Sequence, residues 1–138
     1  MSLIEWRDEF KLGISEIDAQ HQRILALINE LYSLFDDKKY AEEGKLDQVI
    51  EELADYAVYH FSTEEKYFQL FGYEAAPEHI KIHEQYKAKI TEWRQRYEKD
   101  KNTAIFFEIS EFLQNWWTWH INNTDRAYVP FLQANGVK

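Results

Sequence analysis

Residues 60–83 carry the sequence HFSTEEKYFQLFGYEAAPEHIKIH, and this stretch decides the fold. Glu64 follows His60 by four positions, and His83 follows His79 by four positions. Residues four apart on an α-helix differ in direction by about 40° and lie one turn apart. Each pair therefore places two potential metal ligands on one helix face, and the stretch predicts two helices joined by a short turn.

The helical period continues outward from this stretch, so that four segments of the chain carry an apolar face. Gly72 is typical of the position after a helix end, and Pro77 suits the first turn of the next helix. Short connections between long amphipathic helices indicate an all-α, antiparallel up-down-up-down four-helix bundle. The residues on the four faces are His21, Ile24, Leu25, Ile28, Leu31 and Phe35; Leu46, Val49, Leu53, Tyr56, His60, Glu64, Phe68 and Phe71; His79, His83, Tyr86, Ile90, Trp93 and Tyr97; and Phe106, Ile109, Leu113, Trp116 and His120.

The chain of 138 residues is long enough for one core, and we expect residues 1–138 to form a single domain. Residues 1–17 are interpreted as an extended amino-terminal arm that lies against the bundle. The bundle itself is expected over about residues 18–122, and the remainder is expected to kink and end in a short helical tail.

Composition and charge exclude several classes of protein. The net charge of −9 makes nucleic acid and anionic membrane surfaces poor partners, and the mean hydropathy of −0.63 argues against membrane insertion. The chain contains no cysteine, which excludes disulfides, thiolate metal sites and iron–sulfur clusters. The first residues lack the apolar stretch of a signal peptide, and we expect a cytoplasmic monomer.

All five histidines of the chain lie on the predicted apolar faces. A single buried histidine is more often a hydrogen-bonded core residue than a ligand. Here five imidazoles converge with two carboxylates, and such nitrogen-rich ligation suits iron, zinc or copper and disfavours magnesium or calcium. Seven ligands are too many for one ion, so the set predicts two ions with bridging carboxylates. The candidate ligands are His21, His60, Glu64, His79, His83, His120 and Asp125.

Asp125 needs a separate argument, because it follows His120 by five positions rather than four. On a straight helix this spacing turns the two side chains about 140° apart. We therefore expect the helix to break between them. The segment Asn122–Thr124 is the expected place, since such side chains compete for backbone hydrogen bonds.

The ordered pattern H…HxxxE…HxxxH…HxxxxD, formed by the seven candidate ligands, resembles the ligand signature of the hemerythrin family. Three further stretches resemble the family, namely GISEIDAQHQ at residues 13–22, GYEAAPEH at residues 72–79 and WHINNTDRAY at residues 119–128. The resemblance extends over nearly the whole chain and points to the single-domain bacterial members.

The resemblance implies a non-haem di-iron centre bridged by Glu64, Asp125 and an oxo or hydroxo group. One iron keeps an open position, and the implied function is reversible binding of dioxygen for storage, delivery or buffering. The implied partner is dioxygen, with an oxygen-using enzyme as a candidate recipient. By positional match, one iron is completed by His79, His83 and His120, and the iron with the open position is bound by His21 and His60.

The residue pattern also separates a carrier from an enzyme. Oxygen-activating di-iron enzymes of the ferritin-like type use carboxylate-rich sites with Glu-x-x-His motifs, which this chain lacks. Asp18, three residues before His21, is interpreted as a helix cap. We therefore expect a carrier without enzymatic activity. Two alternatives stay open, a di-iron redox or oxygen sensor that signals to a partner and an enzyme that handles peroxide or nitric oxide.

Four apolar residues are candidates for an oxygen pocket beside the open position. Phe61 and Trp116 match apolar residues that line this pocket in the family, and Ile24 lies one turn beyond the first histidine. Trp117 stands three residues before His120, where the family often carries Leu or Ile. Its indole could narrow the pocket, gate entry, donate a hydrogen bond to the bound ligand or point elsewhere. Each of the four could equally be an ordinary core residue.

Overall fold

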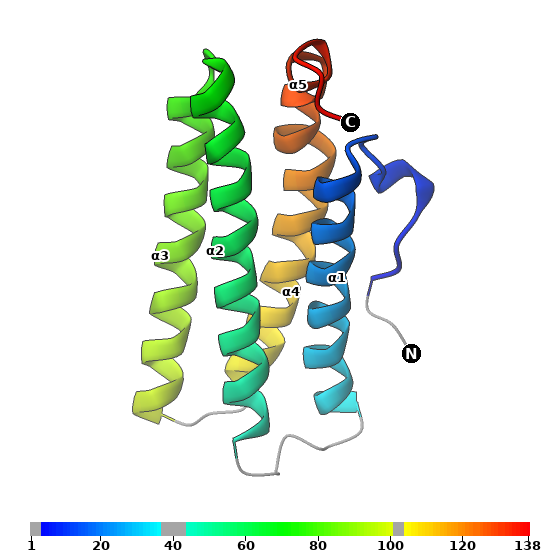
Figure 1. Cartoon of the computed structure of the whole chain (residues 1–138). Helices are drawn as coiled ribbons and strands as arrows, with labels where there is room; N and C mark the ends of the chain where they lie inside the picture. Colours follow the sequence, from blue (N-terminus) through cyan, green and yellow to red (C-terminus); the bar gives the residue numbers. More distant parts are fainter. Residues whose placement is uncertain (1–3, 37–43, 101–103) are drawn as a thin grey trace.

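Four long helices run side by side in alternating directions in the computed structural model of the chain, which describes residues 4–36, 44–100 and 104–138 (Figure 1). They are α1 Ser15–Asp36, α2 Lys45–Phe71, α3 Ala76–Asp100 and α4 Ala104–Trp119. Helix α1 contacts α2 and α4, and α3 contacts the same two helices, so the four close into a bundle. This confirms the predicted all-α, up-down-up-down architecture. Phe35 was predicted on the apolar face of the first helix, but its side chain is not among those that the structure describes.

The turn between α2 and α3 is short and has the chemistry expected from the sequence. Gly72 adopts a left-handed conformation with φ of 70°, and its N–H donates to the carbonyl of Phe68 at 2.9 Å. Pro77 is the second residue of α3, where a missing N–H costs nothing. The tight turn sets α2 and α3 antiparallel. The pair His60 and Glu64 on α2 therefore faces the pair His79 and His83 on α3.

The chain leaves α4 through a π-helical turn, η3, at His120–Asp125. The backbone stays right-handed helical at both ends of this turn, with φ and ψ of −66° and −46° at Trp119 and −57° and −31° at Arg126. The predicted break at Asn122–Thr124 is therefore wrong, because the helix widens instead of breaking. In an i→i+5 turn, side chains five apart again share a direction. After η3 the chain ends in the 3₁₀ turn η4 Arg126–Tyr128 and the helix α5 Val129–Ala134.

The amino-terminal arm lies along the outside of α1 (Figure 1) and includes the 3₁₀ turn η1 Asp8–Phe10. The side chain of Asn29 on α1 pairs with both backbone groups of Ile4, at 2.9 and 2.6 Å. Asp18 lies inside the first turn of α1 and accepts the N–H of Leu12 at 2.8 Å. Asp18 therefore ties the arm to the helix, and the interpretation of this carboxylate as the cap of α1 is corrected.

The apolar core is divided into two parts. The larger part fills the bundle and includes Phe61, Tyr86 and Trp117, whereas the smaller part lies under the tail and includes Phe68 and Tyr128. The ring of His83 stacks on a residue of the larger part, and the ring of His79 contacts two residues of the smaller part. The histidines therefore form a polar layer between two apolar layers.

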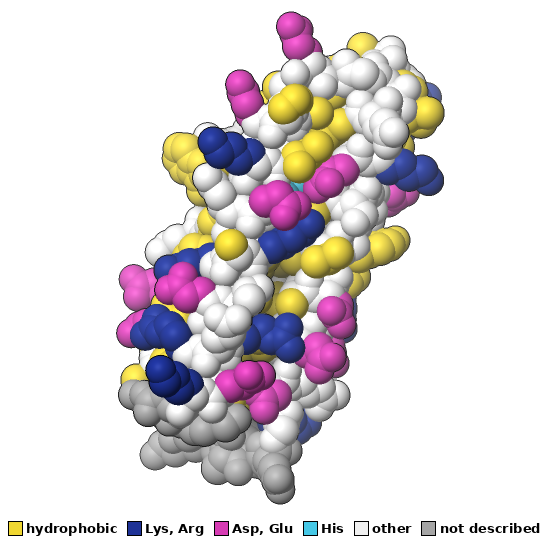
Figure 2. Space-filling model, turned by 90° about the vertical axis from the view of Figure 1, so that its left-hand side faces the viewer, with side chains coloured by type: hydrophobic (Ala, Val, Ile, Leu, Met, Phe, Trp, Pro, Cys, Tyr) yellow, Lys and Arg dark blue, Asp and Glu magenta, His cyan; other side chains and the backbone are white. Residues whose placement is uncertain are grey.

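The surface over α2 and α3 mixes charges of both signs (Figure 2). Lysine, arginine and acidic side chains alternate across this face, with apolar side chains between them. Only a small spot of histidine is visible, in agreement with exposed fractions of 0–4% for the five histidines. Within the residues that the structure describes, none of the helices combines the length and the apolar character needed to cross a membrane.

Candidate metal centre

Seven polar side chains from α1, α2, α3 and the π-helical turn η3 meet inside the bundle, and they form two groups that share Glu64 and Asp125. Within each group the possible ligand atoms lie within 4.8 Å of one another. All seven side chains are buried. The structure thus brings together every ligand predicted from the sequence. The five-donor group is Glu64, His79, His83, His120 and Asp125, and the four-donor group is His21, His60, Glu64 and Asp125.

The two oxygens of Asp125 contact different groups. Oδ2 lies 2.8 Å from Nε2 of His21, whereas Oδ1 lies 2.9 Å from Nε2 of His120 and 3.0 Å from Nε2 of His79. The π-helical turn η3 explains this reach, because it turns Asp125 toward the side of the helix that already carries His120. One carboxylate therefore lies between the two groups.

Glu64 occupies the corresponding place on α2. Its Oε1 lies 3.3 Å from Nε2 of His60 in the four-donor group and 3.2 Å from Nε2 of His83 in the five-donor group. The two shared carboxylates thus connect four helical segments through one buried layer.

Several atoms of this layer lie close to one another but form no hydrogen bond of suitable geometry among the described residues. They are Nε2 of His79, His83 and His120, both oxygens of Glu64, and Oδ1 of Asp125. In the four-donor group, Nε2 of His21 faces Nε2 of His60 at 3.2 Å. Buried polar groups without partners cost about 1–3 kcal/mol each, and two nitrogen lone pairs that face each other repel unless a proton or a metal ion lies between them. The donor set therefore fits a bound cation.

Two of the histidines are oriented by a hydrogen bond at Nδ1, the outer nitrogen, which faces away from the shared carboxylates. Nδ1–H of His60 donates to Oε1 of Gln20 at 2.7 Å, and Nδ1–H of His83 donates to Oε2 of Glu65 at 2.9 Å. Neither acceptor oxygen can donate, so each ring carries its proton on Nδ1. Nε2 is therefore the nitrogen of each ring that remains to bind a metal, and it faces the shared carboxylate of Glu64.

The electrostatics of the layer couple carboxylates to imidazoles. Burial and the charge of Asp125 raise the pKa of Glu64, but the imidazoles of His60, His79 and His83 outweigh them and lower it to about 2. Burial lowers the pKa of His79, but contacts with Asp125 and Glu64 outweigh it and raise this pKa to about 9. In the absence of a metal, protons on imidazoles therefore balance the carboxylates, and a cation would take over that role.

Comparison with known proteins places these residues in a family. The family profile described as Hemerythrin HHE cation binding domain matches residues 12–132. The chain belongs to the hemerythrin family. It is 36% identical over 129 residues to bacteriohemerythrin of Pseudomonas aeruginosa, a match that covers 94% of this chain and 81% of that protein. It is 33% identical to bacteriohemerythrin of Clostridium acetobutylicum, which covers 90% of this chain and 97% of that protein.

Solved hemerythrin structures agree with the fold. The crystal structure of a wild-type hemerythrin superposes with a TM-score of 0.80 and 24% identity, over 94% of this chain and 97% of that chain. A leucine-to-alanine variant of a hemerythrin gives a TM-score of 0.81 with 25% identity over the same shares. This chain is thus a hemerythrin-like cation-binding protein with a buried cluster of histidine, glutamate and aspartate.

Aromatic rings cover this hemerythrin cluster on the side of the larger core. Phe61 stacks on His83 with ring centroids 3.9 Å apart, and Trp116 stacks on His120 at 4.2 Å. Phe61 and Trp117 are fully buried, as is Ile24, whereas Trp116 is half-buried. The four residues predicted from the sequence as an oxygen pocket therefore all lie in the core that adjoins the cluster.

Gln20 and Glu65 were not identified from the sequence. Each immediately precedes or follows a predicted ligand, and neighbours on a helix point about 100° apart, away from the ligand face. Their partners stand on other helices, so a single sequence does not reveal the contacts. The available signal was their position beside His21 and Glu64, together with the rule that ligating histidines usually find an outer hydrogen-bond partner.

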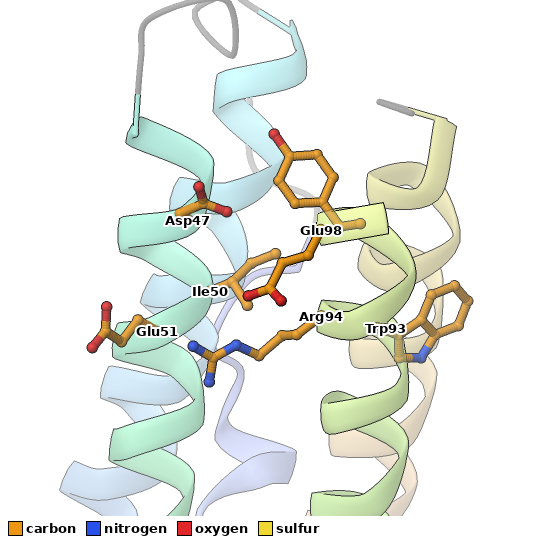
Figure 3. Close-up of a pocket in the computed structure, with 7 residues that line it drawn as sticks. Asp47, Ile50, Glu51, Trp93, Arg94 and Glu98 are labelled. Carbon is orange, nitrogen blue, oxygen red and sulfur yellow. The ribbon is translucent and has the colours of Figure 1, made fainter. Parts of the chain in front are cut away.

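A surface pocket of about 250 Å³ between α2 and α3 does not belong to the cluster. Arg94 and Glu98 point into it from α3, whereas Trp93 turns away toward the other side of the helix (Figure 3). On α2, Ile50 of this pocket precedes His60 by ten residues, which corresponds to about 15 Å along the helix. The pocket therefore carries no part of the candidate metal centre.

Proposed function

We propose that the buried cluster holds two iron ions and that the chain binds dioxygen reversibly, for storage, delivery or buffering. The observation that carries this proposal is the sharing of Glu64 and Asp125 by a five-donor group and a four-donor group. Two carboxylates with contacts on both sides suit two neighbouring ions better than one. The iron ions would supply the electrons and the coordination position that reversible dioxygen binding needs.

The unequal number of donors supports a division of labour between the two positions. The five-donor group would nearly fill an octahedral iron, whereas the four-donor group, with His21 and His60, would leave more room for an external ligand. Five neutral imidazoles supply donors without adding charge, which suits a dry interior. In this proposal Glu64 and Asp125 would contribute donors to both ions.

The surrounding residues would keep water from the dioxygen position. Phe61 and Trp117 are fully buried and stack on each other with ring centroids 5.7 Å apart. Trp117 also lies 5.8 Å from the ring of His60 in the four-donor group. A dry apolar wall beside the centre favours release of dioxygen unchanged, because oxidation of the site with loss of a reduced oxygen species requires protons.

The donor set favours a carrier over an oxygen-activating enzyme. Sites that activate dioxygen in ferritin-like proteins are rich in carboxylates, whereas this cluster holds five imidazoles and two carboxylates. The relatives named bacteriohemerythrin and, at 26% identity over 89% of this chain, the myohemerythrin of Riftia pachyptila support the same class.

The proposal is tested by metal content and by a reversible spectrum. Iron-replete protein should contain about two irons per chain, one for each ligand group. Reduced protein should change its visible spectrum on exposure to dioxygen and return to the starting spectrum when dioxygen is removed. Glu64→Ala should lower the content of both irons, because this carboxylate serves both groups. One iron per chain at saturation, or a spectrum that never reverts, would contradict the proposal.

A further inference from the structure

The outer nitrogens of the candidate ligands have unlike partners. Nδ1 of His83 meets a carboxylate oxygen of Glu65, and Nδ1 of His60 meets an amide oxygen of Gln20. Nδ1 of His21 is buried and has no hydrogen-bond partner among the described residues. The carboxylate partner belongs to the five-donor group, and the amide and unpartnered cases both belong to the four-donor group.

The contact of Glu65 crosses from one helix to another. Glu65 follows Glu64 on α2, and its Oε2 accepts the Nδ1–H of His83 on α3 at 2.9 Å. The histidine side chain is fully buried, while the carboxylate is 29% exposed. The arrangement is a carboxylate–histidine pair in which the Nε2 lone pair faces the centre. Such a carboxylate raises the basicity of the ligand nitrogen.

The amide of Gln20 is held in one orientation. Its Nε2 donates to Oγ1 of Thr63 at 3.2 Å, and Oγ1 of Thr63 in turn donates to the carbonyl of Tyr59 at 3.1 Å. The amide oxygen is therefore the atom that faces His60, and it accepts the Nδ1–H without any negative charge. Gln20 orients His60 but strengthens it as a donor less than a carboxylate would.

We propose that Glu65 is a positioning residue that makes the two metal positions unequal. By holding the Nδ1 proton of His83, it strengthens the metal bond at Nε2, so the five-donor position fills before the four-donor position. Gln20 keeps His60 a weaker, neutral donor at the second position. The inference rests on the proposed binding of two metals, and it adds an order of loading and the residues that set it.

The test is a titration of metal-free protein with cobalt(II), which reports each site through its visible absorption, in competition with a chelator. The wild-type protein should bind two cobalt ions in two separable steps, one for each ligand group. His21→Ala affects the four-donor group alone and should remove the weaker step, which assigns the two steps to positions.

Substitutions at Glu65 should shift the tighter cobalt-binding step, and a substitution at Gln20 should shift the weaker one. Glu65→Ala should weaken the tighter step about 100-fold, and Glu65→Gln, which can keep a neutral hydrogen bond, about tenfold. Gln20→Glu should tighten the weaker step about tenfold. Such a gain would show that a carboxylate on Nδ1 of a ligand histidine strengthens metal binding. A purely structural role for Glu65 does not predict this gain. If Glu65→Ala fails to fold, the isosteric Glu65→Gln decides.

Glu84 provides the matched control. It is adjacent to His83 in the chain, but its side chain is 60% exposed and pairs with Lys87 at 3.1 Å. Glu84→Gln removes the same charge from the same neighbourhood and should change neither step more than twofold. Equal shifts for Glu84→Gln and Glu65→Gln, or both Glu65 variants within twofold of wild type, would overturn the inference. Wild-type protein that binds a single cobalt would instead refute the two-metal function on which it rests.

Discussion

Trp117 has its polar atom engaged within the core. Its indole N–H donates to the hydroxyl of Tyr86 at 3.1 Å, and its ring is fully buried against Phe61. Of the roles considered from the sequence, donation of a hydrogen bond to a bound ligand is therefore the least supported. The contacts favour a role in filling space and excluding water beside His60.

We predict that Trp117→Leu destabilises the protein and speeds autoxidation of the oxygenated form. The smaller side chain leaves a cavity and removes the donor to the Tyr86 hydroxyl, with an expected loss of about 2–4 kcal/mol. A cavity beside polar ligands can admit water, and water brings the protons that autoxidation requires. Urea unfolding measures the first effect, and the decay of the oxygenated spectrum measures the second.

Tyr86→Phe is the control for this prediction, because it removes the same hydrogen bond without opening a comparable cavity. It should lower stability by about 1 kcal/mol and leave the autoxidation rate near that of wild type. If Trp117→Leu and Tyr86→Phe change autoxidation equally, then the hydrogen bond matters rather than the volume. If Trp117→Leu leaves the rate unchanged, Trp117 does not protect the centre.

At the scale of elements, side chains donate hydrogen bonds to backbone carbonyls along the π-helical turn η3. One acceptor is the carbonyl of Trp119, the residue before the turn. Here the side-chain Nδ2 of Asn123 donates to that carbonyl at 3.1 Å. Arg126 donates to the carbonyl of Asn122 at 3.2 Å and also bonds the carbonyl of Glu9 in the arm. Side chains of the turn thus stabilise the wider geometry.

We predict that Asn123→Ala lowers iron content more than it lowers stability. Without the Asn123 amide, and with a better helix former at this position, the turn should tighten toward α-helical geometry. Asp125 would then rotate away from His120 and lose its contacts with both groups. The expected change in stability is small, about 0.5–1 kcal/mol, whereas iron retained after gel filtration should fall clearly.

Asn135 gives a matched control, because its side-chain amide also donates to the backbone carbonyl four residues earlier. Its Nδ2 donates to the carbonyl of Phe131 at 2.9 Å, with the same spacing of four residues but outside the cluster. Asn135→Ala should cost a similar amount of stability and leave the iron content unchanged. An equal loss of iron in both variants, or no loss in either, would argue against a role of η3 in aligning Asp125.

The same elements show what could be predicted from the sequence and what could not. The long helices follow from apolar spacing, and the tight turn between α2 and α3 follows from Gly72 and Pro77, because these signals are local. The wider turn at His120–Asp125 was not predicted, since the same polar residues are compatible with a break. Whether the helix breaks or widens depends on tertiary contacts such as that between Arg126 and the arm. The outer partners Gln20 and Glu65 depend on neighbouring helices in the same way.

On the scale of the whole molecule, the bundle carries a polar layer between two apolar cores. Without metal, this layer is stabilised by protonated imidazoles beside the carboxylates, and the raised pKa of His79, about 9, expresses that pairing. With metal, the ligands must be deprotonated, so metal takes the place of the protons. The stability of the two forms should therefore depend on pH differently above neutral pH.

We predict that metal-free protein loses stability as the pH rises from 6.5 to 9, whereas metal-loaded protein does not. The pKa of His79 is about 9 in the folded chain and 6.5 ordinarily. Its contribution is therefore complete below pH 6.5 and is lost as the pH rises to 9, a change on the order of 3 kcal/mol. Urea unfolding of both forms at pH 6.5, 7.5 and 9, under anaerobic conditions, measures the two slopes. His79→Gln is the control and should reduce the slope of the metal-free protein, because glutamine does not titrate, whereas the raised pKa of His60 leaves part of the slope in place. Parallel slopes for the metal-free and metal-loaded forms would mean that the metal does not replace protons in the buried layer.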